Sequence, residues 1–359
     1  MDGPVAPTPR IDPAAQFAGR KVLLTGHTGF KGSWLATWLD LLGADVAGYS
    51  DEVPKQGAFH DLGVDEFVES HFGDVGDVEA LGRTVDAVQP DVVFHLAAQP
   101  LVRASWRDRI STFATNVMGT VHAVETALAC PSVQAIVVIT TDKVYENDNL
   151  GRSFREGDPL GGHDPYSASK AAAEIVLSPY RDASHMGLDP RPLVSVRAGN
   201  VIGGGDWSDD RLVPDIVRAL AAGEQVTLRR PDAVRPWQHV LDCLSGYLLV
   251  SAAMLDGRPV ADSYNFAHSA GEKSVLDVAR RAAASWGAPD DAIVIDRDDS
   301  TAEATLLQLD ATLAMDDLGW GPRWSVDQAI DETIRFYRSD EMAALGRRQI
   351  EEHTAASLV

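Results

Sequence analysis

The stretch Lys21–Gly32, KVLLTGHTGFKG, decides the fold. Its first five residues have an apolar centre and predict a short buried strand. Three glycines, Gly26, Gly29 and Gly32, follow at once, and apolar residues then recur at helical spacing as far as Leu42. A glycine-rich turn between a strand and a helix lets backbone N–H groups approach a phosphate at the helix N-terminus. The stretch therefore predicts the opening strand, turn and helix of a dinucleotide-binding fold.

Strand patterns alternate with helix patterns from this stretch through residue 200. Near-continuously apolar strands joined by helices are typical of a parallel sheet covered on both faces. The sequence therefore predicts an α/β fold with a doubly wound parallel sheet of the Rossmann type. The further strands are expected at Asp45–Tyr49, Asp91–Leu96, Ala135–Thr140 and Leu193–Arg197, and the helices at Asp77–Val88, Thr112–Ala129 and Tyr166–Tyr180.

Beyond residue 200 the pattern changes, because glycines and prolines punctuate the chain and the expected strands become shorter. We expect residues 20–200 to form the Rossmann-type domain. Residues 201–345 are expected to form mainly a smaller substrate domain, some strands of which could return to the sheet. Residues 1–19 are expected to be a poorly ordered tail, and residues 346–359 are expected to be a tail as well. In this second part, strands are expected at Gln225–Leu228, Ser263–Ala267 and Ala292–Ile295, and helices at Val240–Leu255 and Ser274–Trp286.

Composition narrows the class of protein. The chain has 359 residues, of which 45% are hydrophobic, and this excludes a wholly disordered chain. Its 31 basic and 53 acidic residues give a net charge of −22, which repels nucleic acid and anionic membranes. No apolar run approaches the roughly 18 residues of a membrane span, and the N-terminal stretch does not resemble a secretory signal, so we expect a cytoplasmic protein. Two cysteines are too few for a disulfide framework, and no metal site is expected.

The residues after the second expected strand favour NAD over NADP as the dinucleotide. An acidic residue at this place normally binds the ribose hydroxyls. Here Ser50 stands at that place and Asp51 follows it, while no arginine is placed to meet a 2′-phosphate. Asp74, after the next short strand, is a candidate for contact with the adenine. Asp77 fits better as the N-cap of the helix that follows.

Two further motifs carry chemistry. Tyr166 and Lys170 lie four residues apart, and therefore on one face of a helix. A lysine ammonium beside a phenol is expected to lower the pKa of the tyrosine, which can then accept a proton from a sugar hydroxyl. Thr141, Asp142 and Lys143 follow the strand AIVVIT, at the sheet edge where ligands of open α/β sheets bind.

Together these motifs resemble the extended short-chain dehydrogenase/reductase family over nearly the whole chain beyond residue 19. Within that family the chain is similar to the nucleotide-sugar 4,6-dehydratases, and in particular to the branch that acts on CDP-sugars. The resemblance implies bound NAD and CDP-D-glucose as substrate, with hydride taken from C4, water eliminated across C5–C6, and hydride returned to C6. The similarity rests on GHTGFKGSW (26–34), HLAAQPLVRAS (95–105), TTDKVYEN (140–147), DPLGGHDPYSASKAAAE (158–174), RAGNVIGGGDW (197–207) and VRPWQHVLD (234–242).

The resemblance also implies catalytic roles. Tyr166 would act as base in the first hydride step, assisted by Thr141 and Lys170, and Asp142 would protonate the leaving 6-hydroxyl. In the dTDP-glucose dehydratases a glutamate follows the aspartate, whereas Lys143 stands there in this chain. Lys143 can be the base only if its pKa is depressed; otherwise it stabilises the developing enolate electrostatically. Both roles stay open.

The binding residues implied by the resemblance fall into two sets. Arg235 is expected at the substrate diphosphate, and Arg211 is as readily a solvated charge. Two helices, near 112–129 and 166–180, are expected to form the contact of a homodimer or a higher homo-oligomer. The cofactor set is Gly26, Thr28, Gly29, Phe30, Lys31, Gly32, Ser50, Asp51, Asp74, Val75, Leu96, Ala97, Ala98, Asn116, Tyr166 and Lys170, and the substrate set is Gln99, Arg103, Asn200, Arg211 and Arg235.

Two other readings of the sequence compete with a dehydratase. The first is a nucleotide-sugar epimerase or reductase on the same scaffold, but a simple epimerase has no need for the Asp142–Lys143 pair. The second is a catalytically silent dinucleotide-binding protein. The presence of Thr141, Tyr166 and Lys170 argues against it.

Overall fold

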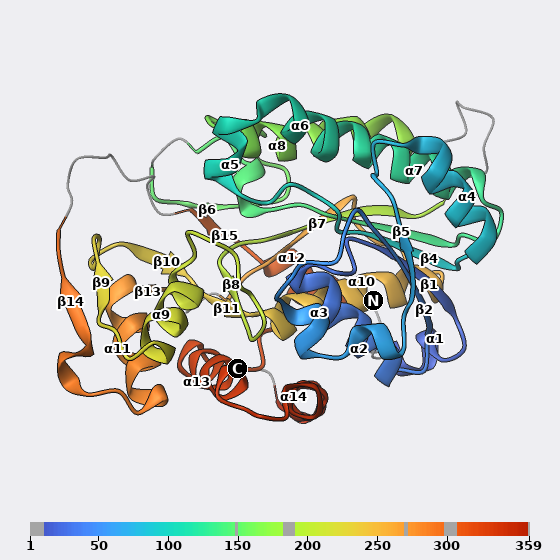
Figure 1. Cartoon of the computed structure of the whole chain (residues 1–359). Coiled ribbons are helices and arrows are strands. Elements are labelled where there is room, and N and C mark those ends of the chain that lie inside the picture. The colour runs from blue at the N-terminus through green and yellow to red at the C-terminus, as the bar shows by residue number, and fades with distance from the viewer. Residues whose placement is uncertain (1–10, 148–149, 182–190, 269–271, 298–306, 358–359) are drawn as a thin grey trace, which may run out of the picture.

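A seven-stranded parallel sheet forms the centre of the computed structural model (Figure 1). The structure describes residues 11–147, 150–181, 191–268, 272–297 and 307–357. The strand order is β3-β2-β1-β4-β5-β7-β12, so the order reverses between β1 and β4. This confirms the doubly wound Rossmann-type sheet. The strands are β1 Lys21–Thr25, β2 Asp45–Ser50, β3 Glu69–Phe72, β4 Val92–His95, β5 Ala135–Ile139, β7 Leu193–Ala198 and β12 Ser263–Phe266.

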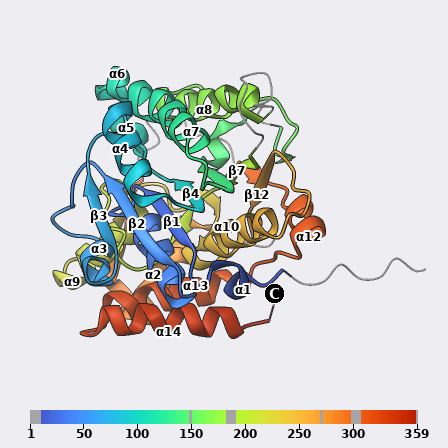
Figure 2. The same cartoon turned by 90° about the vertical axis from the view of Figure 1, so that its right-hand side faces the viewer.

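Helices cover both faces of the sheet because its strands are apolar on both sides. Leu23 and Val93 pack beneath α4 (Val78–Val88), α7 (Gly119–Ala129) and α8 (Pro165–Arg181). Their neighbours along the strands point the other way, toward α1 (Pro13–Phe17), α2 (Phe30–Leu41) and α10 (Val240–Leu255). Figure 1 shows the first group above the sheet, together with α5 (Val102–Arg107) and α6 (Arg109–Phe113), and Figure 2 shows the same layers from the side.

A separate hydrophobic core lies beside the sheet, at the left of Figure 1. It is formed mainly by α9 (Leu212–Ala221), α11 (Val275–Trp286) and α13 (Val326–Tyr337), with β9 (Val226–Leu228) paired to β14 (Ile293–Ile295). Strand β12 comes from the second half of the chain and pairs with β7, so both halves build the sheet. The expected boundary at residue 200 stays a prediction. The remaining elements are α3 Ala58–Asp61, η1 Val64–Glu66, η2 Ala114–Met118, η3 Asp142–Val144, β6 Ser153–Phe154, β8 Val201–Ile202, β10 Val234–Pro236, β11 Gln238–His239, β13 Glu272–Ser274, η5 Asp290–Ala292, β15 Gln308–Leu309, α12 Thr312–Leu318 and α14 Met342–Ala355.

The two expected tails are wrong over the part of each that the structure describes. Helix α1 places Phe17 in the core with no exposed surface. Helix α14 buries Ile350 and His353, and His353 Nε2 lies 2.8 Å from Oδ1 of Asp242 on α10. Both ends have few apolar residues, so their composition resembled that of a tail although a few buried contacts hold each helix. Residues 1–10 and 358–359 lie outside the described residues.

The long helix expected at Thr112–Ala129 is interrupted. Its first turns are α6, its last turns are α7, and the π-helical turn η2 lies between them. Asn116 occupies the middle of that turn and is fully buried. The sequence does not show this extra residue, because apolar residues continue at helical spacing on both sides of it. Only the direction in which the apolar face points changes between α6 and α7. Across the described residues, no helix is sufficiently long and apolar to cross a membrane.

The tight turn after β1 leads to a stability prediction. A Cβ at Gly32 would lie 2.1 Å from the carbonyl oxygen of Gly26, so Gly32→Ala forces backbone apart. We expect a loss of at least about 1–3 kcal/mol in the free energy of unfolding, measured by urea denaturation. Gly82→Ala in α4 is the matched control, since its nearest neighbour would be a methyl group at 3.6 Å. That variant should gain about 0.5–1 kcal/mol; equal stabilities of the two variants would contradict this account.

Candidate active site

The carboxyl ends of β1 and β4 meet where the strand order reverses, which is the ligand crevice of open α/β sheets. Gly26 has φ +75°, and a Cβ there would lie 2.7 Å from the backbone nitrogen of Ala97. The Ala97 N–H donates to Oγ1 of Thr25 at 3.2 Å, and the Leu96 N–H donates to the Thr25 carbonyl at 3.1 Å. The glycine turn and the Leu96–Ala98 segment therefore pack against each other, while their contact with a cofactor stays a prediction.

The start of α2 fits the pyrophosphate of a dinucleotide. Gly29 is the N-cap residue in extended conformation, and it has no side chain to bond the first N–H groups of the helix. Phe30, Lys31 and Gly32 form the first turn. Unpaired N–H groups and the positive end of the helix dipole favour an anion at this place.

Ser50 supports the glycine turn from beneath. Its Oγ lies 2.9 Å from Nδ1 of His27 and accepts from the Thr28 N–H at 3.4 Å. The other ring nitrogen of His27 lies 2.9 Å from Oγ of Ser70. Burial lowers the pKa of His27 to about 4, so the ring is neutral. His27 is a residue that the sequence reasoning missed, although it stands inside the quoted motif; contact between Ser50 and the ribose stays a prediction.

The acidic residues expected near the adenosine lie at the ends of β2 and β3. Asp51 is exposed, and its Oδ1 accepts from the Glu52 N–H at 3.0 Å. Asp74 accepts from the Gly76 N–H at 2.8 Å, so it shapes the turn that contains Val75. Asp77 caps α4, as predicted, through the Ala80 N–H at 2.9 Å. The contacts of Asp51, Asp74 and Val75 with a cofactor stay predictions.

Tyr166, Lys170 and Thr141 come together at the carboxyl end of β5. Lys170 Nζ donates to the carbonyl of Ile139 at 3.1 Å, and Thr141 is hydrogen-bonded to the Tyr166 phenol. Burial, together with the charge of Lys31, lowers the pKa of Lys170 to about 8. Burial raises the pKa of Tyr166, opposed chiefly by the charge of Lys143 and by the Thr141 bond. The expectation that Lys170 lowers the pKa of Tyr166 is therefore wrong. The pKa of Tyr166 is raised, and Lys143 is the main cation acting on it.

Asp142 and Lys143 form an ion pair beside this tyrosine. Asp142 is almost fully buried, and its Oδ1 accepts from Thr141 Oγ1 at 2.8 Å and from Lys143 Nζ at 3.4 Å. The carboxylate raises the pKa of Lys143, so the lysine is held as a cation. Gly199 packs against this pair, because a Cβ there would lie 2.5 Å from Oδ2 of Asp142. The depressed pKa that a free base requires is absent from Lys143 in the described structure.

Lys31 and Asn116 have partners inside the protein. Lys31 Nζ donates to the Tyr247 hydroxyl at 3.4 Å, so the side chain reaches from α2 to α10. Asn116 accepts from the Gln99 N–H at 2.8 Å and donates to the Gln99 carbonyl and to Ser169 Oγ. It thereby joins the segment after β4 to α8. Tyr247 had no sequence signal, because nothing in α10 marks which turn faces the site.

The expected substrate residues come from several elements. Gln99 donates its side-chain amide to Thr112 Oγ1 at 2.9 Å and accepts from the Leu101 N–H. Arg211, just before α9, is close enough that its charge affects both Lys143 and Tyr166, so it belongs to this site.

Three further substrate candidates come from other elements of the chain. Arg103 on α5 pairs with Asp210 at 2.5 Å. Asn200 follows β7 with φ +27°, and Arg235 lies on β10, which pairs with β13. Contact of all five candidates with a substrate stays a prediction.

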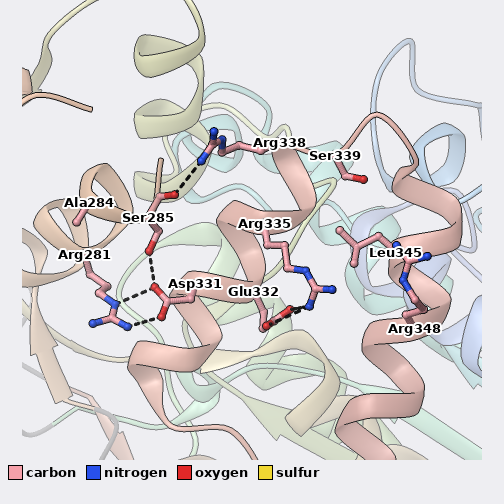
Figure 3. A pocket seen from close by; sticks show the side chains of 10 residues that line it. All are labelled: Arg281, Ala284, Ser285, Asp331, Glu332, Arg335, Arg338, Ser339, Leu345 and Arg348. Carbon is pink, nitrogen blue, oxygen red and sulfur yellow. Dashed lines mark hydrogen bonds and ion pairs between the residues drawn. The ribbon is translucent and has the colours of Figure 1, made fainter. Parts of the chain in front are cut away.

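A hollow of about 770 Å³ between α11, α13 and α14 lies apart from these residues (Figure 3). Four of its six charged side chains pair with one another: Arg281 with Asp331, and Arg335 with Glu332 (Figure 3). Paired surface charges contribute little. Within the described ranges, no cluster of three or more His, Cys, Asp or Glu side chains is placed to hold a metal ion.

The buried Lys170 makes stability depend on pH. Its ordinary pKa of 10.5 applies to the unfolded chain, while the folded value is about 8. Between these values the unfolded state binds more protons, so the folded state gains stability as pH rises, by about 3 kcal/mol at most. Lys170→Met removes this gain. In urea titrations, the free energy of unfolding of the parent should rise relative to that of Lys170→Met from pH 8 upward.

Lys55→Met, which removes an exposed lysine, is the control for the loss of one positive charge. Identical pH trends for the parent and both variants would show that Lys170 does not titrate in this window.

Comparisons with known proteins agree with this geometry. The model of the NAD dependent epimerase/dehydratase family matches residues 22–267. The chain is 41% identical over 353 residues to the CDP-glucose 4,6-dehydratase of Salmonella typhimurium, covering 95% of this chain and 98% of that protein.

Solved structures agree as well. The dTDP-glucose 4,6-dehydratase of Streptomyces venezuelae with NAD bound is 26% identical, with a TM-score of 0.75 over 89% of this chain and 97% of that one. The UDP-glucose 4-epimerase of Thermotoga maritima, 22% identical, shares the fold with a TM-score of 0.77 over 89% of this chain and 98% of that one. The resemblance expected from the motifs is confirmed: the chain belongs to the NAD dependent epimerase/dehydratase family.

Proposed function

We propose that the chain is an NAD-dependent nucleotide-sugar 4,6-dehydratase that converts CDP-D-glucose into CDP-4-dehydro-6-deoxy-D-glucose and water. The observation that carries the proposal is the bonded group Thr141, Asp142, Lys143 and Tyr166 at the end of β5, beside the dinucleotide turn. The 41% identity to a protein named CDP-glucose 4,6-dehydratase supports the choice of CDP-glucose. An epimerase would use the tyrosine but has no step for the buried Asp142–Lys143 pair.

Tyr166 is the base of the first step. Its phenolate would accept the proton of the C4 hydroxyl, and the Lys143 cation and the Thr141 hydroxyl favour that phenolate. The glycine turn and the first turn of α2 would hold NAD, which would supply the hydride acceptor for C4 and the hydride donor for C6. Lys170 is held by the Ile139 carbonyl one helical turn from Tyr166, on the face that meets the cofactor crevice.

The Asp142–Lys143 pair serves the elimination that follows. The 4-ketone acidifies the C5 proton. Because Lys143 rests as a cation, it would stabilise the enolate, while the Asp142 carboxylate would accept the C5 proton and pass a proton to the leaving 6-hydroxyl. The step ends with the ion pair restored and water released. The raised pKa of Lys143 makes the ion pair the resting form.

Incubation with NAD and CDP-glucose tests this function, with product identified by NMR and dTDP-, GDP- and UDP-glucose as comparison substrates. We expect a 4-keto-6-deoxy sugar, with CDP-glucose preferred. Tyr166→Phe should form no reduced nicotinamide, because the C4 proton has no acceptor. Lys143→Met should form it slowly at neutral pH and faster as pH rises, since loss of the cation raises the pKa of Tyr166, and should then stop before elimination.

The outcome decides between the competing functions. A product epimerised at C4 that keeps its 6-hydroxyl would identify an epimerase, and continuous consumption of a reduced nicotinamide would identify a reductase. Turnover of Lys143→Met at the parent rate would remove Lys143 from both steps.

We also propose that the enzyme is a homodimer. Large apolar side chains are exposed on α5, α6, η2 and α8, which lie together at the top of Figure 1 and Figure 2. A patch of this kind on a protein surface marks an interaction site, and a two-fold contact between identical faces is the most common form. The side chains are Trp106, Ile110, Phe113, Met118 and Ile175.

We further propose that the enzyme is located in the cytoplasm. Its two buried free cysteines, Cys130 and Cys243, fit that reducing compartment.

Light scattering on the eluting protein tests the dimer. The parent should have twice the mass of one chain, and the double variant Ile110→Asp, Ile175→Asp should have the mass of a single chain. Ile295→Asp removes an exposed apolar side chain on β14, away from the patch, and should leave the dimer intact. A parent of single-chain mass would refute the proposal.

A further inference from the structure

Glu174 has no role in the reaction proposed above, yet its carboxylate is among the most buried charged groups of the structure. Its Oε1 accepts from Thr140 Oγ1 at 2.6 Å and from Arg197 Nε at 2.8 Å. Its Oε2 accepts from Ser195 Oγ at 2.5 Å and from Arg197 Nη2 at 3.0 Å. Burial opposes the charge, but these bonds hold the pKa of Glu174 below its usual value. A carboxylate with four donors has no free lone pair for proton transfer, so Glu174 acts by holding its neighbours.

The position of Glu174 makes these bonds relevant to the active site. Tyr166, Lys170 and Glu174 lie on successive turns of one face of α8. Each turn is bound by one of three consecutive residues at the end of β5. The Tyr166 phenol meets Thr141, the Lys170 ammonium meets the Ile139 carbonyl, and the Glu174 carboxylate meets Thr140.

Residues 140–145, which carry Thr141, Asp142 and Lys143, form the catalytic segment. Arg197 on β7 extends the same contact to the far end of this segment. Its Nη1 donates to the hydroxyl of Tyr145 at 2.6 Å, and that hydroxyl donates to Asn265 Oδ1 at 2.8 Å. Tyr145 comes two residues after Lys143. The Glu174–Arg197 pair is therefore connected to the segment that carries Thr141, Asp142 and Lys143 on both sides, through Thr140 before it and Tyr145 after it.

We propose that Glu174 is a positioning residue that, together with Arg197, keeps α8 in register with residues 140–145. The pair thereby aligns Tyr166 and Lys170 on the helix with Thr141, Asp142 and Lys143 on the loop. This inference rests on the proposed function, because it assigns the first three of these five residues to the hydride step and the last two to the elimination. The Thr140 bond serves the first set, and the Tyr145 bond serves the second.

Single hydrogen bonds to the Glu174–Arg197 ion pair can be removed without breaking the ion pair itself. Replacing Glu174 would leave a buried unpaired arginine and endanger the fold. Thr140→Val keeps the side-chain shape and deletes the bond to Oε1 from the catalytic segment, together with the longer bond from Thr140 Oγ1 to the Val196 carbonyl at 3.4 Å. Ser195→Ala is the matched control, because it also deletes one bond to the carboxylate and one longer bond: Ser195 Oγ donates to Oε2 and accepts from Arg181 Nη2 at 3.2 Å. Ser195 lies in the middle of β7, outside the catalytic segment. Thr140→Ser restores the hydroxyl and should restore the parent behaviour.

Two measurements separate positioning from plain stabilisation. The first is the NAD dissociation constant, followed by quenching of tryptophan fluorescence, which needs no sugar substrate. The second is the single-turnover rate of nicotinamide reduction with CDP-glucose. In Thr140→Val we expect NAD affinity several-fold weaker and reduction roughly tenfold slower, because small misplacements of reacting groups are costly. Ser195→Ala should match the parent in both, although melting temperatures of both variants fall.

Tyr145→Phe tests the second connection. Nicotinamide reduction should proceed at close to the parent rate. Formation of the 4-keto-6-deoxy sugar should slow, so reduced nicotinamide accumulates. Parent-like NAD affinity and reduction rate in Thr140→Val, or equal losses in Thr140→Val and Ser195→Ala, would overturn the inference. A parent that binds NAD but leaves CDP-glucose unchanged would instead refute the proposed function, and the NAD affinities would still decide the role of Glu174.

Discussion

The contact between the Gly26 turn and the end of β4 is the constraint on which the rest of the site depends. Only glycine fits at that point, because a Cβ on residue 26 would lie 2.7 Å from the backbone nitrogen of Ala97. Since β1, β4 and β5 are parallel neighbours, closing this contact brings three loops to one edge of the sheet. The glycine turn, the Leu96–Ala98 segment and the Thr140–Tyr145 segment all follow carboxyl ends of these strands. The reactive side chains discussed above come from the last of these segments or from α8.

A second theme is the concentration of positive charge in an acidic chain. The net charge is −22, yet Lys31, Lys143, Lys170 and Arg211 are close enough to influence one another or the same tyrosine. Acidic surroundings repel stray anions over long distances, while the local cations attract a ligand with two phosphates once it arrives. The mutual repulsion of Lys31 and Lys170 is a cost that an anionic ligand between them would relieve. The charge distribution therefore favours nucleotide ligands at this one place.

Much of the site was predictable because it follows from regular spacing. The pair Tyr166 and Lys170 needs only the helical repeat, and the place of Thr141 needs only the end of an apolar strand. The support for these residues could not be predicted in the same way. The bond between Ser50 and His27 depends on how β2 meets the glycine turn, and the four bonds to Glu174 join α8 to two strands. The direction of the Tyr166 pKa was wrong at the sequence level because burial, which outweighs the neighbouring charges, is a property of the packed chain.

The π-helical turn at Ala114–Met118 has a consequence for how this protein can change over evolution. An extra residue in a helix shifts the phase of everything before it by roughly a third of a turn, so α6 and α7 present independent faces. Asn116 stays fixed toward Gln99 and Ser169, while Ile110 and Phe113 remain outside. The outer surface can therefore change in sequence without rotating the buried amide. Losing that one inserted residue would couple the two faces again, and a change on the outer surface would then disturb the interior of the site.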